Sequence, residues 1–365
     1  MKIAFLCKRQ YMSKDVILDR YARLYEIPNQ LALLGHQVEC FCLSYQSHID
    51  GVWNESDENK YLIWTSKSYS AYQKLKILSY PIYLLKKIEQ SQPDIVIAAS
   101  DIPHIVLGAW CAKKLNKPFV ADLYDNFESY GQAKIPFIKT LFQHALDSAQ
   151  LISTTSHSLA EKIKQDHPDV PFILTMPSVI DKELFFQGNK IEARKKLKLP
   201  IQAQLIGTAG SLTKAKGIND LLSAWRIVRQ QNPDAYLVLA GPVGECTVLP
   251  DDNRVIYLGL LPHSDVNYLF QALDVGILCI PDDNFGRYCF PQKAYEMLAT
   301  NLTIISTNVG DMKKLLEQDL LYDANDFESL AFKINDQLTY LTKVNIEIPD
   351  WKNNLECFNS LIRQI

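Results

Sequence analysis

The chain has 365 residues, with 38 Lys and Arg against 41 Asp and Glu and a net charge of −3. A chain this long exceeds one ordinary hydrophobic core, so about two domains are expected. The balance of charge leaves no positive field that would favour a nucleic acid, and we expect no DNA or RNA partner.

The eight cysteines are scattered along the sequence, and only Cys40 and Cys42 lie close together. Their spacing puts both on one face of a strand and does not make a CxxC clip, so disulfides and structural zinc are not expected. We expect most of these cysteines to be small buried hydrophobes in a reducing cytosol. The apolar run within Met1–Lys8 is too short for a signal peptide, and no stretch approaches about 18 apolar residues. The sequence predicts a protein that is neither secreted nor membrane-spanning.

Short apolar segments rich in β-formers alternate with longer amphipathic segments along the whole chain, which is typical of parallel sheets covered by helices on both faces. In the first half the predicted strands are 2–7, 38–43, 95–99, 119–123, 151–154 and 172–175. In the second half they are 205–209, 235–240, 255–258, 275–280 and 302–306. The charged stretch 188–200 has little strand character, so we predict a linker there between domains 1–187 and 201–345. Two doubly wound domains create a cleft, and open parallel sheets bind ligands at the carboxyl ends of their strands.

The predicted strand 205–209 runs into a turn that contains Gly210, Ser211, Lys216 and Gly217 and precedes a helical segment. Gly210 permits close approach of the backbone, Ser211 offers a hydroxyl and an amide, and Lys216 can counter the charge of a diphosphate. The spacing is not that of a Walker loop. The alternative is that the glycines serve the geometry of the turn alone.

A second segment, FGRYCFPQKAYEMLATNLTIIS at 285–306, combines a loop, a proline-started helix and a buried strand. Pro291 suits the first turn of a helix, whose free N–H groups attract anions. Lys293 and Glu296 share one face, so the ammonium can lie by a phosphate while the carboxylate accepts hydrogen bonds from a ribose. Asn301 suits the end of this helix because asparagine tolerates a left-handed backbone. The alternative is an amphipathic helix whose Lys293 and Glu296 are merely solvated.

With these landmarks the chain resembles the retaining GT-B glycosyltransferases of glycosyltransferase family four (glycosyl transferases group 1). The resemblance covers nearly the whole chain and rests on the order of its landmarks. In the second half these are AGSLTKAKG at 209–217, the strand and glycine at 238–241, VIYLG at 255–259 and the block at 272–306. In the first half they are the segments 31–38, 118–125, 152–163 and 177–185. It implies an α/β GT-B fold of two doubly wound Rossmann-like domains facing a central cleft. It also implies that the last segment, 346–365, forms a helix that packs back on the first domain.

The resemblance assigns roles on the donor side. Glu296 matches the second glutamate of the family's pair, which binds the ribose, and Lys216 matches the phosphate-binding lysine. Ser211 stands where relatives have an arginine, and Lys293 or Arg287 can supply the missing cation. Tyr288 replaces the first glutamate, which leaves backbone amides to hold the sugar, as in a recognised variant of the family. The resemblance also places Leu258 in the wall around the base. The residues expected to bind substrate are Gly210, Ser211, Lys216, Leu258, Arg287, Tyr288, Phe290, Pro291, Lys293 and Glu296.

On the acceptor side, Tyr124 and Asp125 stand where many relatives have a His before an Asp, with Asp122 two residues earlier. A phenol can donate a hydrogen bond to the sugar, and a carboxylate can orient or deprotonate an acceptor hydroxyl, so we expect Tyr124 and Asp125 to be the catalytic residues. The alternative is a polar strand end that caps the next helix. The family's glycine pair near the amino terminus is missing, and the loop from Arg9 to Arg23 offers arginines that either meet an anion or form surface ion pairs.

The expected activity is transfer of a sugar from a nucleotide-diphosphate sugar, UDP ahead of GDP, to a saccharide or lipid-linked saccharide acceptor in bacterial surface-polysaccharide, lipopolysaccharide or glycolipid synthesis. Retention of configuration follows from the resemblance. The chain contains no Asp-x-Asp triplet, so we expect leaving-group activation by lysines and a helix amino end, without a metal or other cofactor. The alternatives are a nucleotide-sugar binding protein without turnover and a GT-B sugar-nucleotide epimerase.

Two segments of the first half, 74–87 and 134–142, are both basic and apolar. Such segments can lie on anionic lipid. We expect a cytoplasmic protein, and contact with the cytoplasmic face of the inner membrane is a hypothesis. The alternative is that the apolar sides pack on the sheet and the lysines face water.

Overall fold

The chain forms two compact units in a computed structural model that describes residues 1–365 except 13, 47, 70–75, 290–291, 347 and 349. Unit 1 comprises Met1–Ser178 and Pro349–Ile365, and unit 2 comprises Val179–Ile348. Both are α/β units, and each is built on a mainly parallel sheet. The division falls at residue 178, ahead of the predicted linker at 188–200.

Unit 1 contains, within its described residues, an eight-stranded sheet in the order β10-β9-β8-β7-β1-β4-β6-β5. Neighbouring strands are parallel except for β5, which runs antiparallel to β6. The strands are β1 (Lys2–Lys8), β4 (Gln37–Ser44), β5 (Gly51–Asn54), β6 (Tyr61–Ser68), β7 (Ile95–Ala99), β8 (Phe119–Leu123), β9 (Leu151–Thr154) and β10 (Phe172–Thr175). A small antiparallel hairpin, β2 (Gln10–Tyr11) and β3 (Lys14–Asp15), follows β1.

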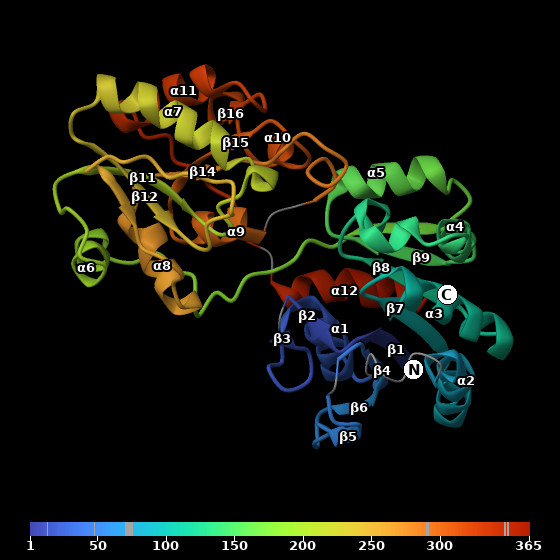
Figure 1. Cartoon of the computed structure of the whole chain (residues 1–365). Coiled ribbons are helices and arrows are strands. Elements are labelled where there is room, and N and C mark those ends of the chain that lie inside the picture. Colours follow the sequence, from blue (N-terminus) through green and yellow to red (C-terminus); the bar gives the residue numbers. More distant parts are fainter. Residues whose placement is uncertain (13, 47, 70–75, 290–291, 347, 349) are drawn as a thin grey trace. The chain divides into compact units, whose positions relative to one another are not determined.

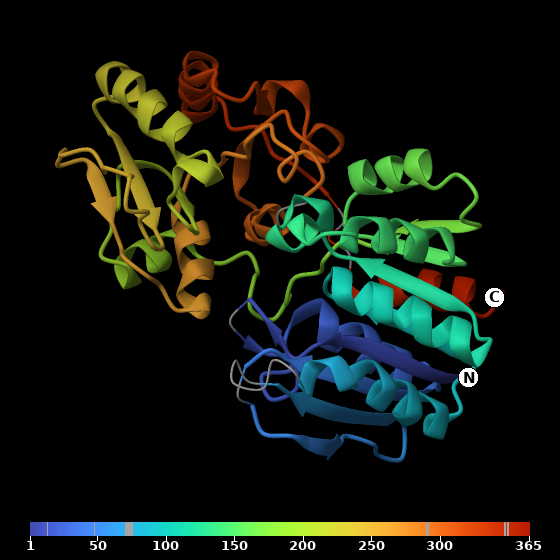
Figure 2. The same cartoon turned by 45° about the vertical axis from the view of Figure 1, so that its right-hand side comes forward.

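The helices of unit 1 lie on both faces of this sheet (Figures 1 and 2). Helices α2 (Tyr80–Ser91), α3 (Ile102–Leu115) and α4 (Ile138–Asp147) pack side by side on one face, and α1 (Ala22–Leu33) and α12 (Trp351–Ile362) pack against each other on the opposite face. Helix α5 (His157–Asp166) packs on β9 and β10. Short 3-10 turns lie at Lys76–Ser79 (η2), Phe127–Ser129 (η3) and Gly131–Lys134 (η4).

Unit 2 has a parallel sheet that, over its described residues, runs β13-β12-β11-β14-β15-β16. The strands are β11 (Gln204–Ala209), β12 (Ala235–Ala240), β13 (Val255–Tyr257), β14 (Val275–Leu278), β15 (Thr303–Thr307) and β16 (Leu321–Tyr322). Helices α7 (Ile218–Gln231) and α11 (Phe327–Thr339) cover one face, while α8 (His263–Ala272) and α9 (Gln292–Ala299) cover the other, with α6 (Lys190–Lys196) packed on α8 (Figure 1). Shorter helical turns are η5 (Lys214–Lys216), α10 (Met312–Leu315) and η6 (Gln318–Leu320).

The predicted strands are all present, with ends shifted by at most two residues. They were visible because strands buried on both faces read as nearly continuous apolar runs, and β7, β8, β9, β14 and β15 are buried at every residue. Asn301, the second residue after α9, has φ +62°, which confirms it as the left-handed residue at the end of this helix. Cys40 and Cys42 are both buried in the core on the same face of β4, as predicted.

The sequence did not reveal β5, β6 and β16. Strand β6 alternates buried and half-buried residues and lies next to the sheet edge, so it lacks a continuous apolar run. Strand β5 is half exposed, and β16 has only two residues.

The predicted linker at 188–200 contains helix α6, which belongs to unit 2. Its Arg194 is buried, and the guanidinium donates to the carbonyl oxygens of Ala272, Ile201 and Ala203 and pairs with Asp274 at 2.8 Å. One of the charged residues on which the linker prediction rested, Arg194, therefore satisfies buried backbone acceptors.

Helix α12 completes the hydrophobic core of unit 1. Its buried residues Leu355, Phe358 and Ile362 join the cluster that includes the inward side chains of β1, β4 and β7. The side chain of Asp350 accepts from the N–H of Asn353 and fixes the start of the helix. The predicted return of this segment to the first domain matches its membership of unit 1.

We predict that Phe358→Ala lowers the free energy of unfolding of unit 1 by roughly 3 to 5 kcal/mol, because it leaves a cavity in a fully buried cluster. The exposed neighbour Glu356→Ala is the control, with a change within about 0.5 kcal/mol. Urea unfolding followed by hydrogen exchange of peptides from each unit measures the effect. Equal losses in both variants, or a loss confined to unit 2, would contradict the assignment of α12.

Candidate functional site

The carboxyl edge of the unit 2 sheet holds most of the residues predicted to bind substrate. The strand order reverses between β11 and β14, and loops that follow these two strands diverge there. In sheets of this order, ligands bind in the crevice at that reversal. Gly210 and Ser211 follow β11, and the loop that carries Arg287 and Tyr288 follows β14.

Gly210 lies directly against Lys293. It has φ +128°, and a Cβ built on it would lie 2.2 Å from Nζ of Lys293, so the ammonium group rests on bare main chain. Only glycine combines that backbone angle with that approach. The structure thus brings together two residues that the sequence placed in separate motifs.

Backbone hydrogen bonds join the loops at this edge. Gly210 N–H donates to the carbonyl oxygen of Ala240, and Leu212 N–H donates to that of Pro242, at 2.9 and 2.8 Å. Gly241 N–H donates to the carbonyl oxygen of Gly259 at 2.7 Å, and a Cβ on Gly241 would lie 2.0 Å from the carbonyl oxygen of Gly210. The turns after three neighbouring strands therefore form one connected layer of main chain.

Leu258 belongs to the same layer. Its N–H donates to the carbonyl oxygen of Leu239 at 2.9 Å, and the hydroxyl of the adjacent Tyr257 donates to the carbonyl oxygen of Gly241 at 2.8 Å. The half-buried Leu258 is thus fixed through its backbone, and its place in a wall around a base stays a prediction.

Two lysines approach each other at this edge without a carboxylate in ion-pairing contact within the described part of the chain. Lys293 is half-buried, and burial lowers its pKa. The carboxylate of Glu296 raises this pKa, whereas the charge of Lys216 lowers it further. Lys216 is exposed in η5, with Nζ 4.1 Å from the ring centroid of Phe285. Two neighbouring positive charges of this kind attract an anion.

Gly217 sets the direction in which α7 leaves this site. It has φ +74°, and a Cβ there would lie 3.0 Å from Cβ of Cys279 at the end of β14. The short turn with Lys216 is therefore pressed against the strand on the other side of the reversal.

Glu296 lies one helical turn after Lys293, on the same face of α9, as the spacing predicted. Its side chain is 10% exposed, and its Oε1 lies 3.7 Å from Nε2 of His263. His263 begins α8 and packs edge-on against Phe185, with ring centroids 5.1 Å apart. The sequence analysis missed His263, because no motif connects a histidine after Pro262 with a glutamate on the next helix.

The loop between β14 and α9 carries the remaining predicted residues. Arg287 is exposed and pairs with Asp282, with Nε 2.6 Å from Oδ1, and this contact raises its pKa. The N–H of Tyr288 donates to the carbonyl oxygen of Phe285. Phe290 and Pro291 lie outside the described residues. Of the two cations proposed to replace the family's arginine, the structure places Lys293 beside Gly210 and Arg287 on Asp282.

Tyr124 and Asp125 follow β8 at the carboxyl edge of the unit 1 sheet. Lys8 Nζ donates to the Tyr124 hydroxyl at 2.9 Å, and the Tyr124 ring packs on Tyr11 and Phe127. Burial raises the pKa of Tyr124, so the phenol keeps its proton and can donate it to a ligand. The carboxylate of Asp125 is largely buried and accepts from the Tyr130 hydroxyl at 2.5 Å.

Arg23 and Asp122 form a buried ion pair, which corrects the expectation for Arg23. Their side chains are 1% and 0% exposed, with Arg23 Nε 2.9 Å from Asp122 Oδ2, and Ser153 also donates to this carboxylate. Arg23 is therefore neither a surface residue nor free to meet an anion. Asp122 lies in the core and does not face a ligand beside Tyr124.

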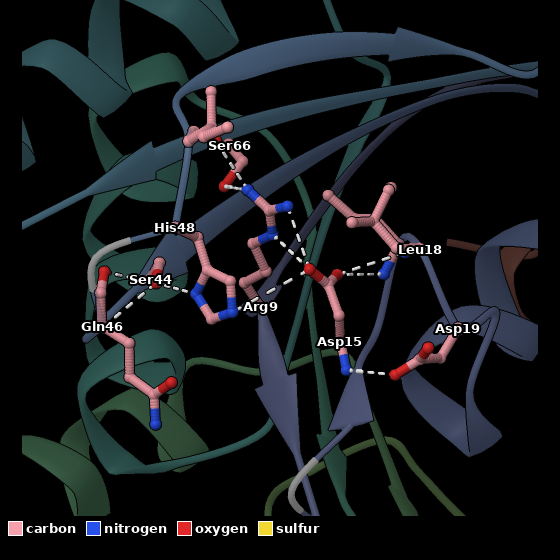
Figure 3. Close-up of polar contacts among 10 residues, drawn as sticks. Arg9, Asp15, Leu18, Asp19, Ser44, Gln46, His48 and Ser66 are labelled. Atoms are coloured by element: carbon pink, nitrogen blue, oxygen red, sulfur yellow. Dashed lines mark hydrogen bonds and ion pairs between the residues drawn. The ribbon is translucent and has the colours of Figure 1, made fainter.

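Arg9 is likewise occupied within the fold (Figure 3). Its guanidinium pairs with Asp15 at 2.9 Å and donates to Ser66, and its exposed fraction is only 2%. His48 lies 3.9 Å from the same Asp15 carboxylate, and its other ring nitrogen is 2.6 Å from the Ser44 hydroxyl. The cluster in Figure 3 fixes the hairpin after β1 to the ends of β4 and β6.

Two family models match the chain, one in each unit. "Glycosyltransferase Family 4" matches residues 22–183, and "Glycosyl transferases group 1" matches residues 203–339. The fold defines a GT-B protein with two Rossmann-like sheets. The chain belongs to the glycosyltransferase family that these two models describe.

Curated relatives are similar at low identity. A Bacillus subtilis protein, whose name places it as a glycosyltransferase in teichuronic acid biosynthesis, is 27% identical over 68% of this chain, and the match spans about three fifths (62%) of that relative's length. N-acetyl-alpha-D-glucosaminyl L-malate synthase of Bacillus anthracis is 20% identical over 80% of this chain and 76% of its own.

Solved structures share the fold. HepE of Anabaena in complex with UDP superposes with a TM-score of 0.73 at 15% identity, over 100% of both chains. Sucrose-phosphate synthase from Thermosynechococcus elongatus gives 0.69 at 15% identity, over 100% of this chain and 96% of that one.

We predict that Lys216→Met raises the pKa of Lys293, because removal of a neighbouring positive charge makes protonation of the second lysine less costly. A pH titration followed by NMR of ¹³C-labelled lysine measures this pKa, with the signal assigned by Lys293→Arg. Lys214→Met, an exposed lysine of the same turn, is the control and leaves the pKa of Lys293 where it was. If the pKa of Lys293 changes no more in Lys216→Met than in Lys214→Met, Lys216 and Lys293 do not interact specifically.

Proposed function

We propose that the protein transfers a sugar, with retention of configuration, from a UDP sugar bound by unit 2 to a hydroxyl of a saccharide acceptor bound by unit 1. One observation supports the donor site in unit 2: the Lys293 ammonium lies directly against the main chain of Gly210, with Lys216 nearby. In the described part of the chain, no carboxylate is in ion-pairing contact with either lysine. A diphosphate supplies the negative charge that such a pair lacks. HepE, a structural neighbour, binds UDP and UDP-glucose.

The donor is held in this proposal by groups that the fold places at one edge. Lys293, Lys216 and the main chain at Gly210 and Ser211 bind the diphosphate, and the base lies against the backbone at Leu258. Glu296 accepts hydrogen bonds from the ribose. His263, 3.7 Å from Glu296, restrains that carboxylate before the ribose arrives.

The same positive groups favour departure of the diphosphate. Negative charge grows on the leaving phosphate as the bond from the anomeric carbon breaks, and fixed cations and N–H groups stabilise this charge without reorganising. We expect this activation to need no metal. The sugar itself contacts backbone amides near Tyr288, where relatives have a glutamate.

Tyr124 and Asp125 act on the acceptor in this proposal. The Tyr124 hydroxyl accepts from Lys8 and retains its own proton for a saccharide oxygen, and Asp125 orients the acceptor hydroxyl. The named relatives fit a role in bacterial surface-polysaccharide or glycolipid synthesis, since one of them carries a name from teichuronic acid biosynthesis.

We predict that Lys293→Ala weakens binding of UDP at least about tenfold, because a charge-assisted hydrogen bond in a half-buried site contributes about 1.5 to 3 kcal/mol. Arg287→Ala, which removes an exposed cation already paired with Asp282, changes the affinity less than about twofold. Titration calorimetry with UDP measures both variants.

Failure of UDP and of GDP to bind the unaltered protein would refute the donor site. Binding of UDP sugars without release of UDP, over a panel of saccharide acceptors, would leave a nucleotide-sugar binding protein. Conversion of the sugar nucleotide without an acceptor would indicate an epimerase.

The acceptor proposal includes contact with an anionic membrane, supported by exposed apolar side chains beside lysines in unit 1. Ile135, Phe137 and Leu141 are exposed at the start of α4, Phe137 by 83%, and Leu78 and Ile82 are exposed in and before α2. Lys74 and the rest of 70–75 lie outside the described residues. In the part of the chain that the structure describes, no helix has both the length and the apolar content to cross a bilayer.

We predict that Phe137→Asp reduces co-sedimentation with anionic phospholipid vesicles severalfold at low salt, because a charge replaces an apolar side chain that would enter the lipid interface. Phe332→Asp, at a residue 73% exposed on α11 of unit 2, is the matched control and keeps the binding of the unaltered protein. No binding of the unaltered protein to such vesicles would remove the membrane from the proposal.

A further inference from the structure

The sheet of unit 1 has its own reversal of strand order, between β1 and β7. Lys8 is the last residue of β1, and Ser100 directly follows β7. The N–H of Lys8 donates to the Ser100 hydroxyl at 2.9 Å, so the two strand ends are joined at the reversal. Ser100 has φ +91°, a strained conformation for a residue other than glycine, and such strain gathers at functional sites.

The ammonium of Lys8 has unused hydrogen-bonding capacity. It carries three N–H donors, and its one hydrogen bond from Nζ in the described part of the chain goes to the Tyr124 hydroxyl. The group is half-buried and lies 5.5 Å and 5.4 Å from the ring centroids of Tyr11 and Tyr124. Burial lowers its pKa, because few charged or polar contacts offset the loss of water.

The acidic side chain whose charge acts on Lys8, Asp101, is already occupied. Asp101 caps α3 by accepting from the N–H of His104, and its Oδ1 also lies 2.6 Å from His104 Nδ1. The Tyr45 hydroxyl donates to Oδ2 at 3.2 Å. Asp101 therefore contributes charge near Lys8 without forming an ion pair with it.

The arginines around this edge are also engaged. Arg9 pairs with Asp15, Arg23 pairs with Asp122, and the exposed Arg20 lies 3.5 Å from Glu55. Lys67, at the end of β6, pairs with Asp50. Lys8 is thus the cation at the reversal that has no carboxylate partner among the described residues.

We propose that Lys8 forms an oxyanion site in unit 1 that binds a carboxylate or phosphate carried by the acceptor saccharide, with Tyr124 and Tyr11 beside it. This proposal rests on the proposed function in one respect, namely that unit 1 takes the acceptor. The chemical class it assigns is an acidic acceptor, such as a uronic acid or a sugar phosphate. Two open donors on a half-buried ammonium can bind either oxyanion.

The test compares neutral and charged forms of one sugar. Dissociation constants of the full chain for glucose, glucuronate and glucose 6-phosphate are measured by ligand-observed NMR, with galactose and galacturonate as a second matched set. We expect at least one charged form to bind about tenfold more tightly than its neutral parent, and the stronger of the two arms identifies carboxylate or phosphate.

Lys8→Met abolishes this preference, so that each charged sugar binds no more tightly than its neutral parent. Lys67→Met is the matched control, because Lys67 and Lys8 both align with Leu43 across the parallel strands and Lys67 already has its carboxylate. It retains the full preference. Should Lys8→Met not fold, Lys8→Arg keeps the preference, and added NaCl weakens binding of the charged sugars to the unaltered protein without affecting glucose.

Charged sugars that bind no more tightly than neutral ones, a preference that survives Lys8→Met, or a preference that salt does not change would each overturn the proposal. UDP titration of the same samples separates the two claims. An unaltered protein that binds UDP but shows no preference for the charged sugars refutes the oxyanion site alone. A Lys8-dependent preference in a protein that does not bind UDP supports the oxyanion site and refutes the donor site.

Discussion

The reversal of strand order in each sheet is the constraint on which the candidate sites depend. Crossovers between parallel strands are right-handed, so helices that connect strands on one side of the central strand cover one face and those on the other side cover the opposite face. At β11 and β14, and again at β1 and β7, the following loops therefore part and leave the strand ends uncovered. Gly210 and Lys8 occupy corresponding positions, since each stands at the end of the first strand of its sheet.

Two kinds of cation in the two units differ in their surroundings. Arg9, Arg23 and Arg194 are buried with carboxylates or carbonyl oxygens, and they hold loops and helices in place. Removal of one partner from such a buried pair costs about 3 to 5 kcal/mol, which marks these arginines as structural. Lys8, Lys216 and Lys293 lie at strand reversals without an ion pair in the described part of the chain, and an ammonium in that position is free to bind a ligand.

Sequence reasoning located most of the parallel strands, and the motifs around Gly210 and Lys293, because both depend on local signals. Buried strands are continuous apolar runs, and Lys293 and Glu296 lie three residues apart on one helix. The ion pair of Arg23 with Asp122 and the contact of His263 with Glu296 join segments distant in the chain, and a single sequence carries no signal for such pairings. The charge of Arg194 also misled the linker prediction. A sequence does not distinguish a buried arginine that donates to carbonyl oxygens from a solvated one.

The membership of α12 in unit 1 has a consequence for the order in which the protein folds on the ribosome. Unit 2 is one continuous segment, Val179–Ile348, whereas unit 1 needs residues from both sides of it. Synthesis proceeds at about 5 to 20 residues per second, so unit 2 has emerged in full while the apolar face of β1, β4 and β7 still lacks Leu355, Phe358 and Ile362. The half that is translated first is therefore the half whose hydrophobic core is completed last.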